Sequence, residues 1–194
     1  MAEQQRDRQN QNFKGNGRHD NKPEEKQFTE NVVSIDRVSR VVKGGRRFRF
    51  RALIVLGDGK GKVGVGVSKG QDVQSAVQKA ADVARKNMVD IALHNQTIPH
   101  EVEAKLAGAH ILMKPAATGT GLKAGGVVRV ILEAVGVHNI LSKSLGSSNK
   151  INSAYATIKA LEQLVGAGEW VTAPIHAKNK KASAKKVAAT KEAK

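Results

Sequence analysis

The clearest pattern in the chain is an alternation of apolar and basic residues over residues 46–57. One parity carries the apolar side chains Phe48, Phe50, Ala52, Ile54 and Leu56. The other parity carries Arg47, Arg49 and Arg51. Successive side chains of a strand point to opposite faces, so this pattern predicts a half-buried strand with an arginine-lined outer face.

Two further strands are expected around this one, over residues 33–43 and 61–69. Gly44 and Gly45 indicate a tight hairpin at Lys43–Arg46, because glycine tolerates the positive φ of such turns. A helix with an apolar stripe is predicted from a cap at Asp72 to about Asn87. The first unit, residues 28–95, is therefore expected to be a β-β-β-α antiparallel sheet with one packed helix.

The pattern after the connector at 94–99 predicts a second unit over residues 96–168. Strands are expected at 101–107, 109–115 and 138–145, and a glycine-rich turn at 118–126. Residues 127–135 fit either a helix or a buried strand. A last helix is expected to be capped by Ser148 or Asn149 and ended by Gly166. The order is then β-β-α-β-α, and the fold class is α+β with two domains.

The two ends of the chain differ from this core in composition. Residues 1–27 are almost entirely polar, and residues 169–194 are rich in Ala and Lys. Such segments bury too little apolar surface to offset the entropy of ordering, so we expect both to be disordered, the second as a basic tail.

The charge distribution gives the first indication of function. The chain has 33 basic and 17 acidic residues, a net charge of +16 and a pI near 10.3. Residues 37–69 carry ten cations against the single acid Asp58. The cations are Arg37, Arg40, Lys43, Arg46, Arg47, Arg49, Arg51, Lys60, Lys62 and Lys69. This concentration favours an anionic partner, with nucleic acid the leading candidate.

Other chemistries lack candidates in the sequence. The absence of cysteine excludes disulfides and thiolate metal sites. The six histidines form no i,i+4 pair, and no catalytic signature is present. No apolar run approaches the ~18 residues of a spanning helix, and no secretory leader is visible. We therefore expect a cytoplasmic protein that is not an enzyme and needs no cofactor or metal.

Three features leave alternatives open. Residues 59–64 match G-x-G-x-x-G, but a strand follows where a nucleotide site needs a helix, so a hairpin turn is favoured. Gly64 and Gly66 share one strand face, which indicates close approach of another backbone, protein or RNA. Gly119 and Gly121 could offer N–H groups to an anion, but an ordinary loop without a ligand is favoured.

Phe48 and Phe50 lie between arginines, as in platforms that stack single-stranded bases. They share parity with Ile54 and Leu56, however, and this favours core packing. Recognition of phosphates and shape is therefore better supported than sequence-specific reading of bases.

Several short motifs follow one another over roughly residues 30–165. They are RVSR at 37–40, VKGGR at 42–46, GDGKG at 57–61, GTG at 119–121, AGG at 124–126, GVHN at 136–139, GS at 146–147 and IN at 151–152. In this order they resemble the family of the fifth protein of the bacterial small ribosomal subunit.

The resemblance implies a first domain like a double-stranded-RNA-binding fold and a second with a left-handed β-α-β connection. It implies a place in the 30S particle on 16S rRNA, where mRNA enters, beside the fourth and eighth small-subunit proteins, with roles in assembly, translational accuracy and mRNA unwinding. By position, Lys43, Gly44, Gly45 and Arg46 would touch rRNA. Gly121, Lys123 and Arg129 would lie near the fourth protein.

Two other functions remain open from the residues alone. One is a free double-stranded-RNA-binding regulator. The other is an enzyme with a glycine-loop nucleotide site, because folds like that of the second half recur in such enzymes.

Overall fold

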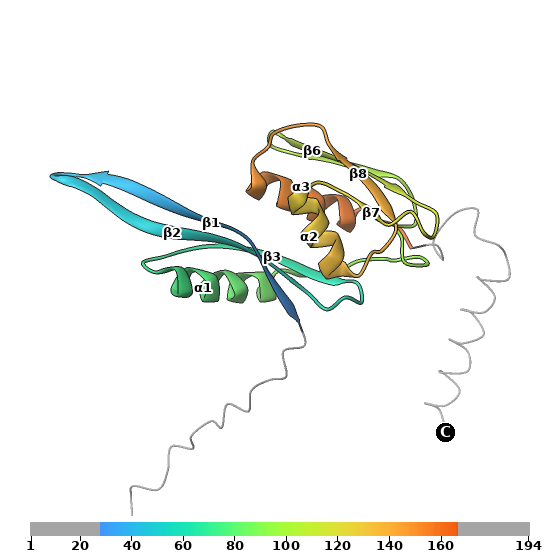
Figure 1. Ribbon diagram of the computed structural model, residues 1–194, viewed down its shortest axis with the longest axis horizontal. Helices are drawn as coiled ribbons and strands as arrows, with labels where there is room; N and C mark the ends of the chain where they lie inside the picture. The colour runs from blue at the N-terminus through green and yellow to red at the C-terminus, as the bar shows by residue number, and fades with distance from the viewer. Residues whose placement is uncertain (1–27, 167–194) are drawn as a thin grey trace, which may run out of the picture.

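The computed structural model describes residues 28–166, and the first part of this range forms one antiparallel sheet (Figure 1). Its strands are β1 (Thr29–Val42), β2 (Gly45–Gly57), β3 (Lys62–Gly70) and β4 (Met88–Asp90), in that spatial order. Helix α1 (Val73–Lys86) follows β3 with Asp72 at its N-cap position. The three predicted strands and the helix are confirmed. The short β4 was missed because three residues are too few to show an alternation.

The second part forms a mixed sheet with two helices. Its elements are β5 (Val102–Leu106), β6 (Ala109–Pro115), β7 (Leu122–Lys123), α2 (Gly126–Val135), β8 (Ile140–Ser144) and α3 (Lys150–Glu162). The spatial order is β5-β6-β8-β7, and β7 runs parallel to β8 with α2 as the crossover. The predicted α+β class is confirmed.

Some boundaries in this half differ from the expectation. Residues 127–135 form a helix whose buried Val128, Ile131, Leu132 and Val135 follow helical spacing. The strand predicted over 138–145 starts only at Ile140, because the N–H groups of residues 138 and 139 donate to the carbonyl of Gln96. Asn149 caps α3 by accepting from the Ile151 N–H at 3.1 Å, and the helix ends before Gly166.

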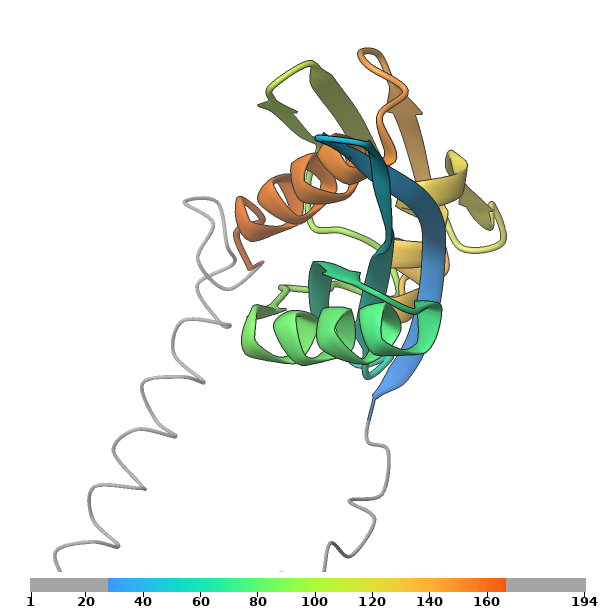
Figure 2. The ribbon, with the colours of Figure 1, turned by 90° about the vertical axis from the view of Figure 1, so that its left-hand side faces the viewer.

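The first sheet is covered on both faces. Ala52, Ile54 and Leu56 pack against the alanines of α1. Leu53 and Val55, on the opposite parity, join the core formed by α2, α3 and the second sheet. Figure 2 shows α1 on one side of the sheet and the second half on the other. The expectation of a half-buried strand is therefore wrong for this part of β2, because the second half of the chain covers the face that was expected to meet solvent.

Glycines permit the closest contacts. A Cβ at Gly64 or Gly66 would overlap a backbone carbonyl of α1, that of Ala84 or Ala80 respectively. The backbone expected to approach these glycines is thus the protein's own helix.

The turn after β2 joins the two halves directly. The N–H groups of Gly59 and Gly61 each donate at 3.0 Å, to the carbonyls of Ala134 and Val135 at the end of α2. A helix leaves its last carbonyls without intrahelical partners, so this turn caps α2. The segment that matches G-x-G-x-x-G is therefore a structural contact.

The predictions for residues 1–27 and 169–194 lie outside the described residues. Within 28–166, none of the helices has the length and apolar character needed to span a bilayer.

Candidate nucleic-acid interface

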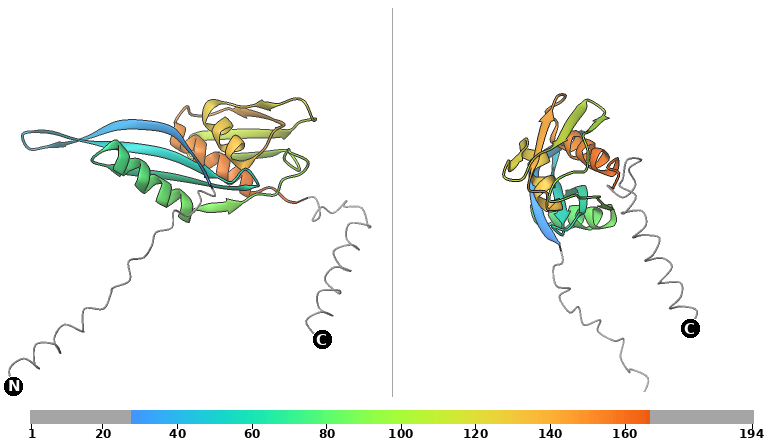
Figure 3. Two further views of the ribbon diagram at one scale, coloured as in Figure 1. Left: turned by 60° about the horizontal axis from the view of Figure 1, so that its bottom comes forward. Right: turned by 90° about the vertical axis from the view of Figure 1, so that its right-hand side faces the viewer.

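The most exposed part of the first sheet is the end of the β1–β2 hairpin, residues 37–50, which we call the hairpin arm. Strand β3 pairs with β2 only as far as the Phe50–Gly70 pair. Beyond that pair, β1 and β2 have only each other as neighbours and project from the body of the molecule (Figures 1 and 3). Gly44, with φ of +84°, makes the turn at the tip. The arm is therefore accessible from outside the body of the protein.

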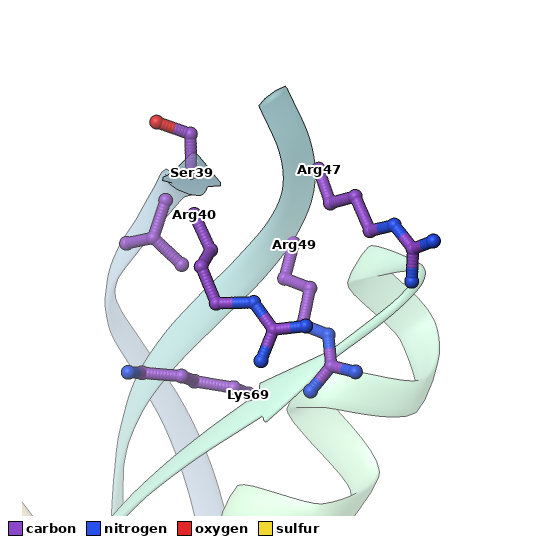
Figure 4. A pocket seen from close by; sticks show the side chains of 6 residues that line it. Ser39, Arg40, Arg47, Arg49 and Lys69 are labelled. Atoms are coloured by element: carbon purple, nitrogen blue, oxygen red, sulfur yellow. The ribbon is translucent and has the colours of Figure 1, made fainter. Parts of the chain in front are cut away.

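One face of the arm carries a cluster of cations that we call the basic hollow. Arg40 pairs with Arg47 across the two strands, so both side chains leave the same face. With Arg49 and Lys69 they line an open hollow of about 290 Å³ (Figure 4). Val38 and Ser39 complete its lining, which contains no acid.

A second hollow extends this cationic surface toward α1. It shares Arg49 and Lys69 with the first and adds Lys79 from the helix, together with Gly70, Gln71 and Ser75. The two linings thus bring five cations together without an acid. Like charges gathered around one hollow create a strong positive potential, which an anion such as phosphate neutralises.

Arg51 differs from the other two arginines of its strand face. Its Nη2 lies 2.9 Å from Oδ2 of Asp36, and its side chain is only 34% exposed. An arginine already paired with a carboxylate has less charge to offer a phosphate. The predicted three-arginine face therefore has Arg47 and Arg49 as its available members.

The opposite face of the arm corrects one expectation. Phe50 packs against the α1 cluster, as predicted. Phe48 does not: the residue is 51% exposed, and the guanidinium carbon of Arg37 lies 4.6 Å from its ring centroid. The expectation that Phe48 belongs to the core was wrong because the arm continues beyond the helix.

The remaining predicted RNA-binding residues fall into two groups. Lys43, Gly44, Gly45 and Arg46 form the exposed tip of the arm. Lys60 and Lys62 lie at the other end of β2, whose 13 residues span roughly 40 Å at about 3.3 Å each. Lys62 also pairs with Asp90 at 3.4 Å. The structure therefore does not bring all twelve predicted residues into one site.

The glycine loop before β7 has its N–H groups hydrogen-bonded within the protein. The N–H groups of Gly119 and Gly121 both donate to Oδ1 of Asn139, at 3.1 and 3.2 Å. Helix α2 starts only at Gly126, so these donors do not belong to its first turn. The ordinary-loop interpretation is the one that the geometry supports, and the signal that sequence reasoning missed was the buried Asn139.

The three residues expected near a protein partner do lie together. Lys123 is exposed on β7, which is an edge strand of the second sheet. Arg129 is exposed on α2 and approaches the carbonyl of Leu122 at 3.5 Å. With Gly121 they share one edge of the second half.

Two histidines of the second half have partners within the protein. His110 pairs with Glu103, and Nε2 of His100 lies 3.0 Å from the Val165 N–H, which donates to it. Among residues 28–166, no group of three His, Asp or Glu side chains is placed to hold a metal ion.

Comparison with known families decides the identity of the fold. The model described as ribosomal protein S5, N-terminal domain, matches residues 28–92, and that described as ribosomal protein S5, C-terminal domain, matches residues 104–170. Together they cover more than half of the chain, in the family's domain order.

The chain belongs to the ribosomal protein S5 family.

Membership in the ribosomal protein S5 family makes the protein a structural, non-catalytic component of the small subunit of the cytoplasmic ribosome. Its partners are rRNA and other ribosomal proteins. The predictions of a ribosomal, RNA-binding and non-enzymatic protein are confirmed. The reading as a glycine-loop enzyme is not supported, since both glycine loops are engaged in contacts within the protein.

Proposed function

We propose that the hairpin arm and the basic hollow bind 16S rRNA in the small subunit. The observation that carries this proposal is the placing of Arg40, Arg47, Arg49 and Lys69 around one open hollow without an acid. Contacts from such a cluster to phosphates would be independent of sequence and strongly dependent on salt. The exposed tip at Lys43–Arg46 extends the same surface beyond the body of the protein.

The finer role follows from the resemblance of residues 30–165 to the small-subunit family. We propose that the protein supports subunit assembly and translational accuracy, and that it lies where mRNA enters, beside the fourth and eighth small-subunit proteins. The clustering of Gly121, Lys123 and Arg129 at the β7 edge supports a contact with the fourth protein there.

The phosphate contacts are tested with the double variant Arg47→Ala/Arg49→Ala. Binding of the full chain to a 16S rRNA fragment is measured over a series of salt concentrations. Each lost phosphate contact lowers the slope of log affinity against log salt by about one, so a decrease of about two is expected. The matched control is Lys105→Ala/Lys159→Ala, which removes the same charge from exposed positions on β5 and α3. An equal decrease in both doubles would contradict a localised phosphate-binding surface.

A sedimentation experiment tests the ribosomal assignment separately. The protein is expected to migrate with 30S particles at moderate salt. A predominantly free pool would favour the free double-stranded-RNA-binding regulator.

A further inference from the structure

The face of the hairpin arm opposite the basic hollow carries an aromatic ring that the fold leaves uncovered. Phe48 pairs across the strands with Ser39, and its diagonal neighbours on the same face are Arg37 and Val41. Phe48 is 51% exposed and Val41 is 75% exposed. The guanidinium of Arg37 lies over the ring at 4.6 Å from its centroid.

The exposure of Phe48 follows from where the covering elements stop. Phe50, two residues further along β2, still pairs with the last residue of β3 and packs against α1. At Phe48 neither β3 nor α1 continues, so only β1 lies beside it. Phe48 and Val41 are both exposed on this face, and an exposed apolar patch is more informative than a single exposed apolar residue.

The surroundings of the ring point to a particular ligand chemistry. Arg46 leaves the same face near the tip, opposite Val41, and no acid occurs between Arg37 and Arg51. A protein surface would have to be acidic to fit these cations. A nucleotide offers both parts at once, since its base has a flat π-face and its phosphate is anionic. Exposed bases in RNA are recognised by stacking on aromatic rings and on guanidinium planes.

We propose that Phe48 and Arg37 form a stacking site for an unpaired nucleobase of the bound RNA. The site rests on the proposed function, because it requires that the arm binds RNA. The arm would then be held on both faces: phosphates lie in the basic hollow, and a base stacks on the Phe48–Arg37 pair. Base stacking is tolerant of sequence, so this site adds affinity and position without specifying one base.

The variant Phe48→Ala tests the site in the full chain, with the same 16S rRNA fragment as probe. Loss of one stacked base weakens binding between about 5-fold and about 150-fold. The salt slope is expected to stay unchanged, because no phosphate contact is removed. Phe48→Trp keeps a stacking surface and is expected to retain affinity. Tyr155→Ala, which removes another exposed ring on α3, is the matched control and is expected to have no effect.

The two proposals fail in distinguishable ways. Suppose that Arg47→Ala/Arg49→Ala leaves the salt slope of RNA binding unchanged while Phe48→Ala weakens binding. The proposed phosphate-binding surface would then be contradicted, and the proposed stacking site would stand. Unchanged RNA affinity in Phe48→Ala would overturn the stacking site. If that variant also entered 30S particles poorly, the ring would belong to a contact with another ribosomal protein. A decrease in both affinity and salt slope would likewise contradict stacking, because it would indicate that the arm had moved as a whole.

A photo-crosslinking residue placed at position 48 provides an independent readout. Irradiation of the bound complex is expected to join this position to a base of the RNA fragment. The same residue at position 155 is the control. Crosslinks from position 155 and none from position 48 would overturn the proposal.

Discussion

In β2, the segment Ala52–Leu56 is fully buried, whereas the segment Gly45–Arg49 is exposed. Both segments pair with β1 in the same hairpin, with one register shift in β1 between Val32 and Ser34, opposite the buried segment. They differ in what lies beside them: α1 and the second half cover the first, and neither buries the second. The same strand therefore contributes core at one end and a binding surface at the other.

This difference shows what an alternating pattern does and does not predict. The alternation states which side chains share a face. Whether that face is covered depends on elements that come later in the chain. Phe48 and Ile54 share a face, yet one is 51% exposed and the other is fully buried. The comparison between the buried and exposed segments can be tested by substitutions placed in each.

The largest effect is expected from Leu53→Ala. Leu53 is 1% exposed in the core shared by the two halves, and deleting such a side chain costs about 2–5 kcal/mol through lost burial and a residual cavity. Phe48→Ala in the arm is expected to change the free energy of unfolding by less than about 1 kcal/mol. Urea denaturation measures both. Comparable losses would mean that the arm contributes to the core after all.

The next effect compares two glycines. Gly66→Ala places a Cβ 2.6 Å from the Ala84 nitrogen of α1 and still closer to the Ala80 carbonyl, so the helix must shift. Such overpacking costs about 1–3 kcal/mol.

Gly44→Ala is the control for this substitution, since its surroundings are open and only its φ of +84° is strained. It is expected to cost about 1 kcal/mol. Hydrogen exchange of the α1 amides distinguishes the two mechanisms: it should accelerate in Gly66→Ala and stay unchanged in Gly44→Ala. Accelerated exchange in both would contradict the assignment of the close contact to Gly66.

The smallest effect is expected from Asp36→Asn, which removes the partner of Arg51. Partly exposed ion pairs contribute little, so stability should fall by less than about 1 kcal/mol. Arg51 then becomes available to RNA, and the salt slope of binding should rise by at most about one. Asp90→Asn, which frees Lys62 at the other end of the sheet, serves as the control. A weaker slope in Asp36→Asn would show that the ion pair positions the arm for binding.

Much of the fold could be predicted because its elements are marked locally. The Gly44–Gly45 turn, the cap at Asp72 and the helical stripes are all encoded by neighbouring residues. The strands β4 and β7 were missed because each has three residues or fewer, and their formation depends on pairing with distant strands. The role of Asn139 was missed for the same reason, since its two donors lie about twenty positions earlier in the chain.

The cations of the candidate site could also be identified from the sequence. The sequence could not show which of them are paired with an acid and which are available to a ligand. Arg47 and Arg51 have the same parity and the same chemistry. Only the structure places Asp36 beside one of them and leaves the other in the basic hollow. It likewise separates Lys60 and Lys62 from the tip of the arm by the length of β2.

By itself, the sequence determined the strand and helix pattern, the cationic character and the motifs of the ribosomal protein S5 family, because each of these is carried by residues close together in the chain. The tertiary structure decided which part of β2 is buried on both faces, which arginines remain available and that Phe48 meets solvent. These outcomes depend on where α1 and the second half end against the sheet, and such contacts join residues that are far apart in the chain.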